Sequence, residues 1–562
     1  MIQDKINSLK ITDTKIRKII KNIEENIEKL SKDTNKDNQL KIIDSISKER
    51  NKYLTYYWSS YIGYLKNIKD EKYLNSEQII AKYEGDYNNA VYKFFEVIDD
   101  IKEKNHIIKV YGKRFIDLAH NQKLLYSNNA ELFEEELSLR KEYRKILNNI
   151  RINFNDEELS LVKLNKYLTD DNEQIRKDAY DKRYEALLSV SEELGNIFLK
   201  LLEIRKKIAA STNFNNYTDY SFTKMNRVDY KEKDLEVFKD VIIKYFVPIK
   251  EKLKETQTKR LNEKELSYYN ASYLFNDGNA KTKYNLEEIC SKLTNIFKNI
   301  NNEFSDLFTM MLENNLIDLE ERENKSAGGI ATFLPNFKVP VFIKRYMDNS
   351  TNFIAITHEF GHSLQLYLNR NKILHENRWP TFDICEIHST TMELLVSDYA
   401  KEIYEDDYKK HLITHYTNLI EILIRTAAVD DFQSKIYSTN IKTIDEVNNI
   451  WKEIYKKYYP TNNYDLDYFK KGILWQADIN RIDDPFYGID YALAEVYALS
   501  FYQKYSSDKE KEIEEYISFC KDGGEIAFKE IAKKYNLLSP FNENDLILLA
   551  NFLKEKLEKI IQ

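Results

Sequence analysis

The sequence predicts a mainly α-helical protein, and three observations support this class. Of the 562 residues, only 12 are Gly and 7 are Pro, so residues that form turns are scarce. A sandwich, barrel or propeller needs a turn about every 8–12 residues, which this composition disfavours. Apolar residues recur at spacings of three and four with Lys and Glu between them, as on long helices. Hydrophobic residues make up 42% and charged residues 31%, so the chain can bury a core and is not disordered.

Residues 1–150 are predicted to form helices only. One stretch shows the apolar spacing clearly, at Ile16, Ile19, Ile20, Ile23, Ile27 and Leu30. Helices continue to about residue 255, with a break predicted between Ser211 and Thr218. We expect an N-terminal helical domain over residues 1–200 and a second domain, residues 201–562, that carries the chemistry.

Residues 328–343, GGIATFLPNFKVPVFI, interrupt the helical spacing. Their β-branched and aromatic residues predict a short strand or hairpin. Pro335 and Pro340 cannot donate hydrogen bonds to a neighbouring strand, so we expect this segment at the edge of a sheet.

Helical spacing resumes after residue 350, and the chemistry is concentrated in His358-Glu359-Phe360-Gly361-His362. At about 100° per residue, His358 and His362 lie one turn apart on the same helix face, so both imidazoles can bind one Zn²⁺. Glu359 is offset by one residue and flanks the metal, where it can take a proton from a metal-bound water.

A second pair, His411 and His415, has the same spacing but carries Leu412 in the position of the Glu. Spacing alone provides no general base, so we expect this second pair to be structural.

A catalytic zinc needs a third protein ligand, and Glu386 in CEIHSTTMELL is the candidate. It follows His362 by 24 residues, enough for the first helix to end and a second to return. Glu393 lies two helical turns further along the same face and is expected to orient one of the ligands. His388 could be a ligand instead, but it points about 200° away from Glu386 on an ideal helix. We keep His388 as a candidate substrate contact, with a structural role as the alternative.

Charge and cysteine content restrict the partners and the compartment. The 85 Lys and Arg and the 92 Asp and Glu are interleaved, and the net charge is -7. No basic stripe is present in the sequence, which argues against nucleic acid as a partner. Cys290, Cys385 and Cys520 lie far apart and form neither a CxxC pair nor a disulfide framework. This pattern is typical of a reducing compartment.

No segment of the sequence is predicted to enter a membrane. The first 15 residues lack the apolar stretch of a signal peptide. The most apolar window, residues 412–429, contains His415, Glu421 and Arg425, which disfavour a membrane-spanning helix. We therefore expect a cytoplasmic protein without nucleic-acid or membrane partners, present as a monomer or a weak homo-oligomer.

Five segments resemble the zinc metallopeptidases of the thimet oligopeptidase and oligoendopeptidase F family, and within it the Pz-peptidase-like oligoendopeptidases. These segments are RLNEKELSYYNASYLF, GGIATFLPNFKVPVFIKRY, HEFGHSLQLY, WPTFDICEIHSTTMELL and WQADINRIDDPFYGIDYALAE. The resemblance covers residues 200–505, whereas the first 150 residues match only as a generic helical domain.

The resemblance implies a two-lobed helical clam, with a deep substrate channel between the lobes and a small β-sheet beside the HExxH helix. It implies an endopeptidase that hydrolyses internal bonds of short unfolded peptides. One Zn²⁺ per chain would be held by His358, His362 and Glu386, with Glu359 as general base and acid.

Three further residues take roles from the resemblance. Tyr487 and Tyr491 match the tyrosine-rich segment that binds substrate and stabilises the oxyanion. Asn480 occupies the position where the family usually carries a substrate-contacting His. An Asn can donate a hydrogen bond but cannot titrate, so the metal site is unaffected while this substrate contact differs.

The predicted parts suggest a mechanism. Zinc lowers the pKa of its water toward about 7 and polarises the scissile carbonyl. Glu359 takes the proton of that water and delivers it to the leaving amine. Residues 339–343 are expected to hold the peptide as an added strand, with Gly329, Val339 and Val341 as substrate contacts.

Two alternatives remain open from the sequence. A zinc carboxypeptidase or dipeptidyl-type enzyme would cut only near chain ends. A helical binding protein with a structural zinc would normally close its site with four ligands, often Cys. Cys385 is the nearby candidate for a fourth ligand, but it directly precedes Glu386, and both could hardly face one metal on a helix.

Overall fold

A computed structural model of the chain describes residues 2–126, 129–326, 329–346, 352–463 and 465–561. Within these ranges helices dominate and the strands form two small sheets, which confirms the mainly α-helical prediction. None of the helices in the described ranges is both long and apolar enough to cross a lipid bilayer.

The N-terminal helices pack around a core of their own, which contains the apolar residues predicted between Ile16 and Leu30. Leu374, from far along the chain, completes this core. Thr12, Asn35 and other polar residues before the helices accept hydrogen bonds from the first free backbone N–H groups, which fixes where the helices begin. The helices are α1 (Ile2–Asn7), α2 (Asp13–Lys32), α3 (Lys36–Lys66), α4 (Glu71–Asp100), α5 (Asn105–Tyr111) and α6 (Lys113–Leu124).

The next helices surround α9, a continuous helix of 39 residues. It ends at Ser211 and α10 begins at Tyr217, which confirms the predicted break. The predicted domain boundary at residue 200 falls inside α9, and the division itself stays a prediction. The elements are α7 (Ala130–Asn149), β1 (Ile152–Phe154), β2 (Glu157–Leu159), α8 (Leu161–Leu164), α9 (Glu173–Ser211), α10 (Tyr217–Lys224), α11 (Glu236–Val241) and α12 (Val247–Arg260).

A three-stranded sheet has the order β3 (Ile317–Asp318), β5 (Val339–Ile343), β4 (Ile330–Leu334). The prediction that residues 339–343 form a sheet edge is wrong, because β5 pairs antiparallel with β4 and parallel with β3. Phe342 donates its N–H toward β3. By alternation Pro340 faces the same side, beyond the end of β3, so its missing N–H removes no hydrogen bond from the β4–β5 ladder.

Val339 and Val341 therefore do not lie on a strand with a free edge. Their N–H groups face β4, where Leu334 and Thr332 are their partners, and both side chains are buried. The expectation that these two residues hold an added peptide strand is therefore wrong. The sequence pattern could not show this, because β3 is only two residues long and joins the sheet from outside the predicted hairpin.

The helix with the HExxH residues, α15, packs directly on β4 and β5, which confirms the small sheet beside it. On its other side it packs against α17, the helix predicted to bring Glu386 back to the histidines. The helices of this region are α13 (Leu286–Ile300), α14 (Asn302–Glu313), α15 (Asn352–Leu368), α16 (His375–Arg378), α17 (Phe382–Ser397) and α18 (Ala400–Tyr404).

The C-terminal helices complete the core around α17. Helix α23 packs against both α17 and α19, and α24 packs against α15. The elements are α19 (Tyr408–Ser438), α20 (Ile444–Tyr458), α21 (Asp467–Lys471), α22 (Ile479–Asp483), α23 (Ile489–Tyr505), α24 (Lys509–Asp522), α25 (Phe528–Tyr535) and α26 (Glu543–Ile561).

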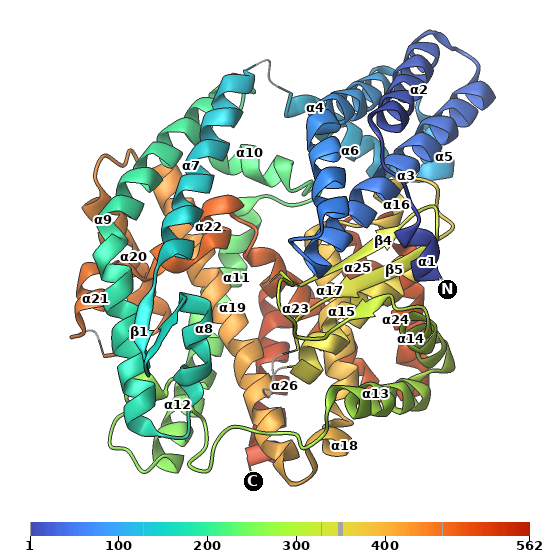
Figure 1. Ribbon diagram of the computed structural model, residues 1–562. Coiled ribbons are helices and arrows are strands. Elements are labelled where there is room, and N and C mark those ends of the chain that lie inside the picture. The colour runs from blue at the N-terminus through green and yellow to red at the C-terminus, as the bar shows by residue number, and fades with distance from the viewer. Residues whose placement is uncertain (1, 127–128, 327–328, 347–351, 464, 562) are drawn as a thin grey trace.

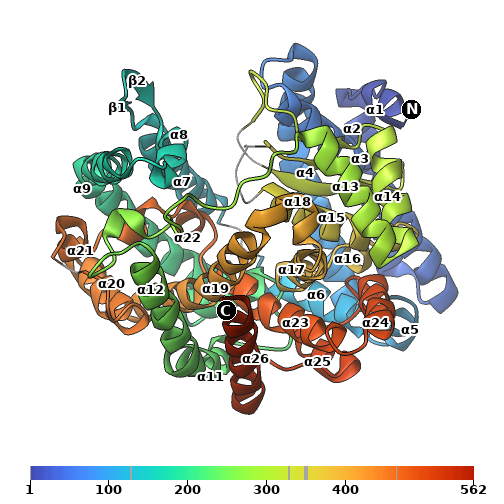
Figure 2. The same ribbon diagram turned by 90° about the horizontal axis from the view of Figure 1, so that it is seen from below.

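Figures 1 and 2 show two groups of helices separated by a central set. Helices α7–α9, α12, α20 and α21 lie on one side, and α1–α5, α13 and α14 lie on the other. Between them stand α19, α23 and α26. This is the two-lobed arrangement that the resemblance implied.

Candidate active site

Three side chains from two helices bring their ligand atoms together. His358 and His362 come from α15 and Glu386 from α17. Nε2 of His362 lies 3.2 Å from Nε2 of His358, and Oε2 of Glu386 lies 3.3 Å and 3.6 Å from these two nitrogens. Ligands about 2.0–2.1 Å from a tetrahedral zinc are about 3.3 Å apart, so the three atoms match the corners of one zinc site.

Burial and neighbouring charges shift the pKa values of Glu386 and His362 toward the forms that bind a metal ion. Burial would raise the pKa of Glu386, but the neighbouring His362 and His358 lower it to about 2. Ser389 also donates a hydrogen bond to Oε2 of Glu386, at 3.0 Å. Burial lowers the pKa of His362, which favours the neutral imidazole that metal binding requires.

Glu393 lies behind His358, as its place on the face of α17 predicted. Its Oε1 is 2.6 Å from Nδ1 of His358. A carboxylate at this position accepts a hydrogen bond from Nδ1, which orients the ring so that Nε2 faces Glu386 and His362. Burial would lower the pKa of His358, but Glu386 and Glu393 raise it well above its usual value.

Glu359 lies on the flank of the histidines and is nearly buried. Its Oε1 forms an ion pair with Nζ of Lys344, at 3.1 Å. Sequence reasoning missed Lys344, whose only signal was a cation placed directly after the apolar residues of β5. Gly329 precedes β4 on the same side, and a Cβ there would lie 3.1 Å from Cγ of Lys344.

Tyr487 lies just before α23 and Tyr491 lies in its first turn, and their hydroxyl oxygens are 2.9 Å apart. Burial raises the pKa of both phenols, and the negative charge of Glu386 adds to the effect at each. Both therefore stay protonated and can donate a hydrogen bond. The side chain of Asn480 lies outside the described part of the structure, so its predicted contact stays a prediction.

The two ligand helices approach each other closely at Gly361. A Cβ on this residue would lie 2.7 Å from both His388 O and Ser389 Cα, which are backbone atoms of α17. Only a glycine permits this approach, so the fourth residue of the HExxH sequence sets the distance between the histidines and Glu386.

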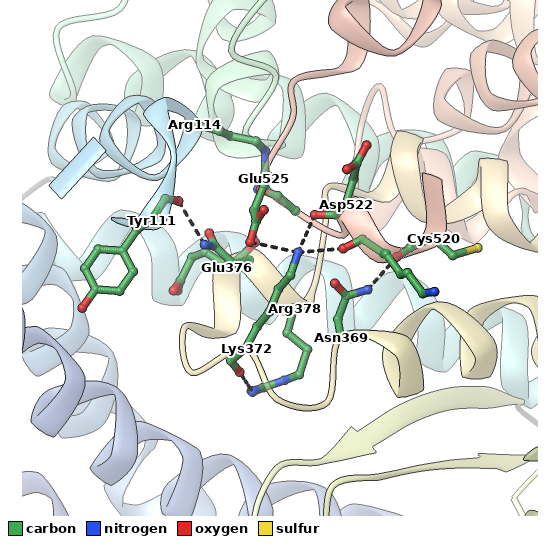
Figure 3. Close-up of polar contacts among 12 residues, drawn as sticks. Tyr111, Arg114, Asn369, Lys372, Glu376, Arg378, Cys520, Asp522 and Glu525 are labelled. Carbon is green, nitrogen blue, oxygen red and sulfur yellow. Dashed lines mark hydrogen bonds and ion pairs between the residues drawn. The ribbon is translucent and has the colours of Figure 1, made fainter. Parts of the chain in front are cut away.

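The chain between α15 and α17 is held by polar contacts from distant segments (Figure 3). Arg114 from α6 donates to the main-chain oxygens of Glu376 and Gly524, the former at 3.2 Å. Lys372 donates to the main-chain oxygen of Asp522 at 2.8 Å. Further bonds join Asn369 to Cys520 O, Asn377 to Tyr111 O and Arg378 to Lys372 O.

A buried ion pair ties the same connection to the N-terminal helices. NH2 of Arg50 on α3 lies 2.5 Å from Oε1 of Glu376. Burial would raise the pKa of Glu376, but the Arg50 guanidinium lowers it to about 2. The N-terminal helices therefore fix the loop that joins the two ligand helices, although they supply no ligand.

A cavity of about 440 Å³ adjoins the candidate metal ligands. His358, Glu359, Glu393 and Tyr491 all line it. A second cavity of about 800 Å³ shares Thr414 and Asn418 of α19 with the first, so the two follow one face of α19 away from the site. These two neighbouring cavities along α19 form the candidate substrate channel.

Two residues named from the sequence lie elsewhere. His388 has no exposed surface and stacks on Phe519 of α24 with ring centroids 4.4 Å apart. Burial lowers its pKa to about 3. His388 is therefore packed away from the channel, which favours the structural alternative over the substrate contact. Cys385 is buried, its Sγ points to Pro380 O at 3.6 Å, and it is not one of the grouped ligand atoms.

The second histidine pair lies beside the candidate site without joining the ligand group. His411 and His415 do not belong to the three-ligand group found among the described residues, as expected. Both nevertheless line the cavity beside Glu359 and Glu393, together with Glu495 of α23. Sequence reasoning missed this placement, because it depends on how α23 packs against α17 and α19 and not on any local pattern.

Known proteins resemble this chain over most of its length. The profile of peptidase family M3 matches residues 166–546, and that of the peptidase M3 N-terminal domain matches residues 6–126. The oligoendopeptidase F homolog of Borreliella burgdorferi is 24% identical over 436 residues, covering 75% of this chain and 70% of that protein. The oligoendopeptidase F homolog of Lactococcus lactis is 22% identical over 518 residues, covering 87% and 83%.

Solved structures share the whole fold. Pz peptidase A with an inhibitor superposes with a TM-score of 0.91 at 26% identity and covers 99% of both chains. An oligoendopeptidase F from Bacillus anthracis superposes with a TM-score of 0.87 at 26% identity and covers 98% of both chains.

Proposed function

The chain belongs to peptidase family M3, and from this premise we propose that it is a zinc-dependent endopeptidase that cleaves internal bonds of short unfolded peptides. The observation that carries the proposal is the triangle of two imidazole nitrogens and one carboxylate oxygen, with sides of 3.2, 3.3 and 3.6 Å. Three protein ligands with a fourth position left for water or substrate are typical of catalytic zinc, whereas structural zinc is normally closed by four.

His358, His362 and Glu386 would hold one Zn²⁺ per chain, with Glu393 orienting His358. When bound, the ion would lower the pKa of a water and polarise the scissile carbonyl. The two histidines and the carboxylate are the nitrogen and oxygen donors that zinc accepts in such sites.

Glu359 would be the general base and acid. It is nearly buried and lines the cavity, and its Oε1 is held by Lys344 at 3.1 Å. The ion pair with Lys344 fixes the position of the Glu359 carboxylate beside His358. Glu359 would take a proton from the attacking water and carry it to the leaving amine nitrogen.

Tyr487 and Tyr491 would bind substrate and stabilise the oxyanion. Their hydroxyls are hydrogen-bonded to each other at 2.9 Å, so one can donate to the substrate while the other fixes its orientation. A preorganised donor of this kind is typically worth about 10²–10³ in rate. Gly329 and Asn480 stay as proposed substrate contacts.

The channel along α19 supports short, extended substrates. Its two cavities, of about 440 and 800 Å³, accept a peptide chain but not a folded domain. We also propose that residues 201–562 form the catalytic domain, that residues 1–200 form the other lobe, and that the enzyme acts in the cytoplasm.

The test uses the full chain, zinc quantification and an internally quenched peptide blocked at both ends. Wild-type protein is expected to cleave this peptide internally, to lose activity with a chelator and to recover it with zinc. Glu359→Gln is expected to keep one zinc and lose at least about 10²-fold in turnover. Glu512→Gln, which removes a buried carboxylate on α24 away from the cavity, is the control. Wild-type turnover in Glu359→Gln would refute the proposal, and cleavage restricted to unblocked ends would refute endopeptidase action.

A further inference from the structure

The cavity beside the candidate catalytic residues contains a carboxyl group that the proposed reaction does not use. Glu495 on α23 is 1% exposed and lines the cavity. Among the described residues, its Oε1 has no hydrogen-bond partner. A buried polar atom without a partner costs roughly 1–3 kcal/mol, a cost that a cationic group bound beside this carboxyl would offset.

The other charges of this cavity already have partners. Lys344 pairs with Glu359, at 3.1 Å, and Glu393 pairs with His358, at 2.6 Å. Of the carboxyl groups that line this cavity in the described structure, that of Glu495 is therefore the one without a cation beside it. Burial raises its pKa well above the usual value, and the nearby negative charge of Glu393 adds to this, which is the state expected while no cation is bound.

The rest of the wall is suited to an aliphatic stem. Ile354, Ala355, Leu419 and Ile422 line the same cavity. His415 contributes a further acceptor site: it is 5% exposed, burial lowers its pKa toward the neutral form, and its Nε2 has no hydrogen-bond partner among the described residues. An apolar wall that ends in polar acceptors matches a side chain with a methylene stem and a cationic head.

We propose that this pocket, with Glu495 as its acceptor, binds an Arg or Lys side chain of the substrate peptide next to the scissile bond. The position follows from the lining, because His358, Glu359 and Tyr491 bound the same cavity and a side chain in it belongs to a residue beside the reacting carbonyl. The inference rests on the proposed peptidase function and adds a substrate preference to it. Glu495 acts in it as a specificity residue and not as a catalytic one.

The first experiment varies the substrate and leaves the protein unchanged. Internally quenched peptides, blocked at both ends, carry Arg or citrulline at each position in turn. Citrulline has the shape of Arg without its charge. At one of the two positions flanking the cleaved bond, wild-type protein is expected to prefer Arg by about 30-fold or more in kcat/KM, the size of a buried charge contact. Equal kcat/KM values for the Arg and citrulline peptides at both flanking positions would overturn the proposed pocket.

The second experiment varies the protein. Glu495→Gln keeps the size of the side chain but cannot ionise when a cation binds. The variant is expected to lose the preference for Arg, with kcat/KM for the citrulline peptide within about threefold of wild type. Glu512→Gln, another buried carboxyl, serves as the matched control and should keep the preference. A Glu495→Gln protein that unfolds at the wild-type temperature and still prefers Arg would overturn the assignment.

Failure of the pocket and failure of the peptidase function are distinguishable by binding. Glu359→Gln protein is titrated with the Arg and citrulline peptides, and the ratio of the two Kd values is compared with that of Glu359→Gln/Glu495→Gln. A ratio of about 30 that falls to about 1 in the double variant supports the pocket even where no cleavage occurs. A ratio of 1 in Glu359→Gln overturns the pocket, whether or not the wild-type protein cleaves peptides.

Discussion

Replacing Gly361 by Ala is expected to weaken zinc binding by forcing the two ligand helices apart. The new Cβ would lie 2.7 Å from His388 O and from Ser389 Cα, whereas ordinary contact begins at 3.4 Å. The clash is with backbone atoms of α17, so no side chain can turn away to relieve it. Relief requires the helices to separate by about 0.7 Å, because close-packed interiors have no spare space.

The separation acts directly on the ligands, since His362 follows Gly361 on α15 and Glu386 is on α17. Metal–ligand distances tolerate only about ±0.2 Å. We therefore expect zinc affinity to fall at least about tenfold, and overpacking of this kind to cost about 1–3 kcal/mol of stability.

Zinc affinity is measured by competition with a chromophoric chelator, and stability by thermal unfolding of the metal-free protein. Gly85→Ala is the matched control, because a Cβ there meets nothing within 4 Å. Gly85 is exposed in the middle of α4, so this control is expected to be neutral or stabilising by up to about 1 kcal/mol. Wild-type zinc affinity and an unchanged midpoint in Gly361→Ala would refute the argument that the glycine sets the helix distance.

Three further variants test other contacts. Tyr491→Phe is expected to lower turnover by about 10²–10³ with zinc content unchanged, and a parallel loss of zinc would contradict its role as a donor. Glu393→Ala is expected to weaken zinc binding about 10–100-fold, since its Oε1 holds Nδ1 of His358 at 2.6 Å; unchanged affinity would count against this. Glu376→Gln is expected to cost about 3 kcal/mol at pH 7, because Arg50, acting against burial, lowers the pKa of Glu376 from 4.5 to about 2. A lowered carboxyl pKa stabilises the fold above pH 4.5, and this stabilisation is lost as the pH falls toward 2. The difference in unfolding midpoint between wild type and Glu376→Gln should therefore shrink in acid. A difference that does not change with pH would contradict the ion pair.

Much of the metal site could be predicted because its residues are encoded by local spacing. The turn of a helix places His358 and His362 on one face, and the length of the following segment allows α17 to return with Glu386 and Glu393. The helical fold could be predicted for the same reason, since apolar spacing in the first 150 residues marks the faces that are buried.

The parts that could not be predicted depend on packing between elements far apart in the sequence. Whether β5 is an edge or a central strand depends on two residues of β3, and nothing in the 328–343 segment records their presence. Lys344 and Glu495 reach the site only because the sheet packs on α15 and α23 packs on α17. His388 was assigned from its angle on α17, but the helix beyond it, α24, buries that face.

The polar cluster between the ligand helices has a consequence for the order of events during synthesis. It joins residues on α3 and α6 with the connection before α17 and with the main chain at Gly524. A ribosome-bound chain from which residue 524 has not yet emerged lacks the contact between Arg114 and the main chain of Gly524. The connection between the ligand helices is then not fully fixed. This connection would therefore gain its full set of contacts only when nearly the whole polypeptide has emerged. A chain truncated before Cys520 is accordingly expected to bind zinc more weakly than the full-length protein in the same competition assay.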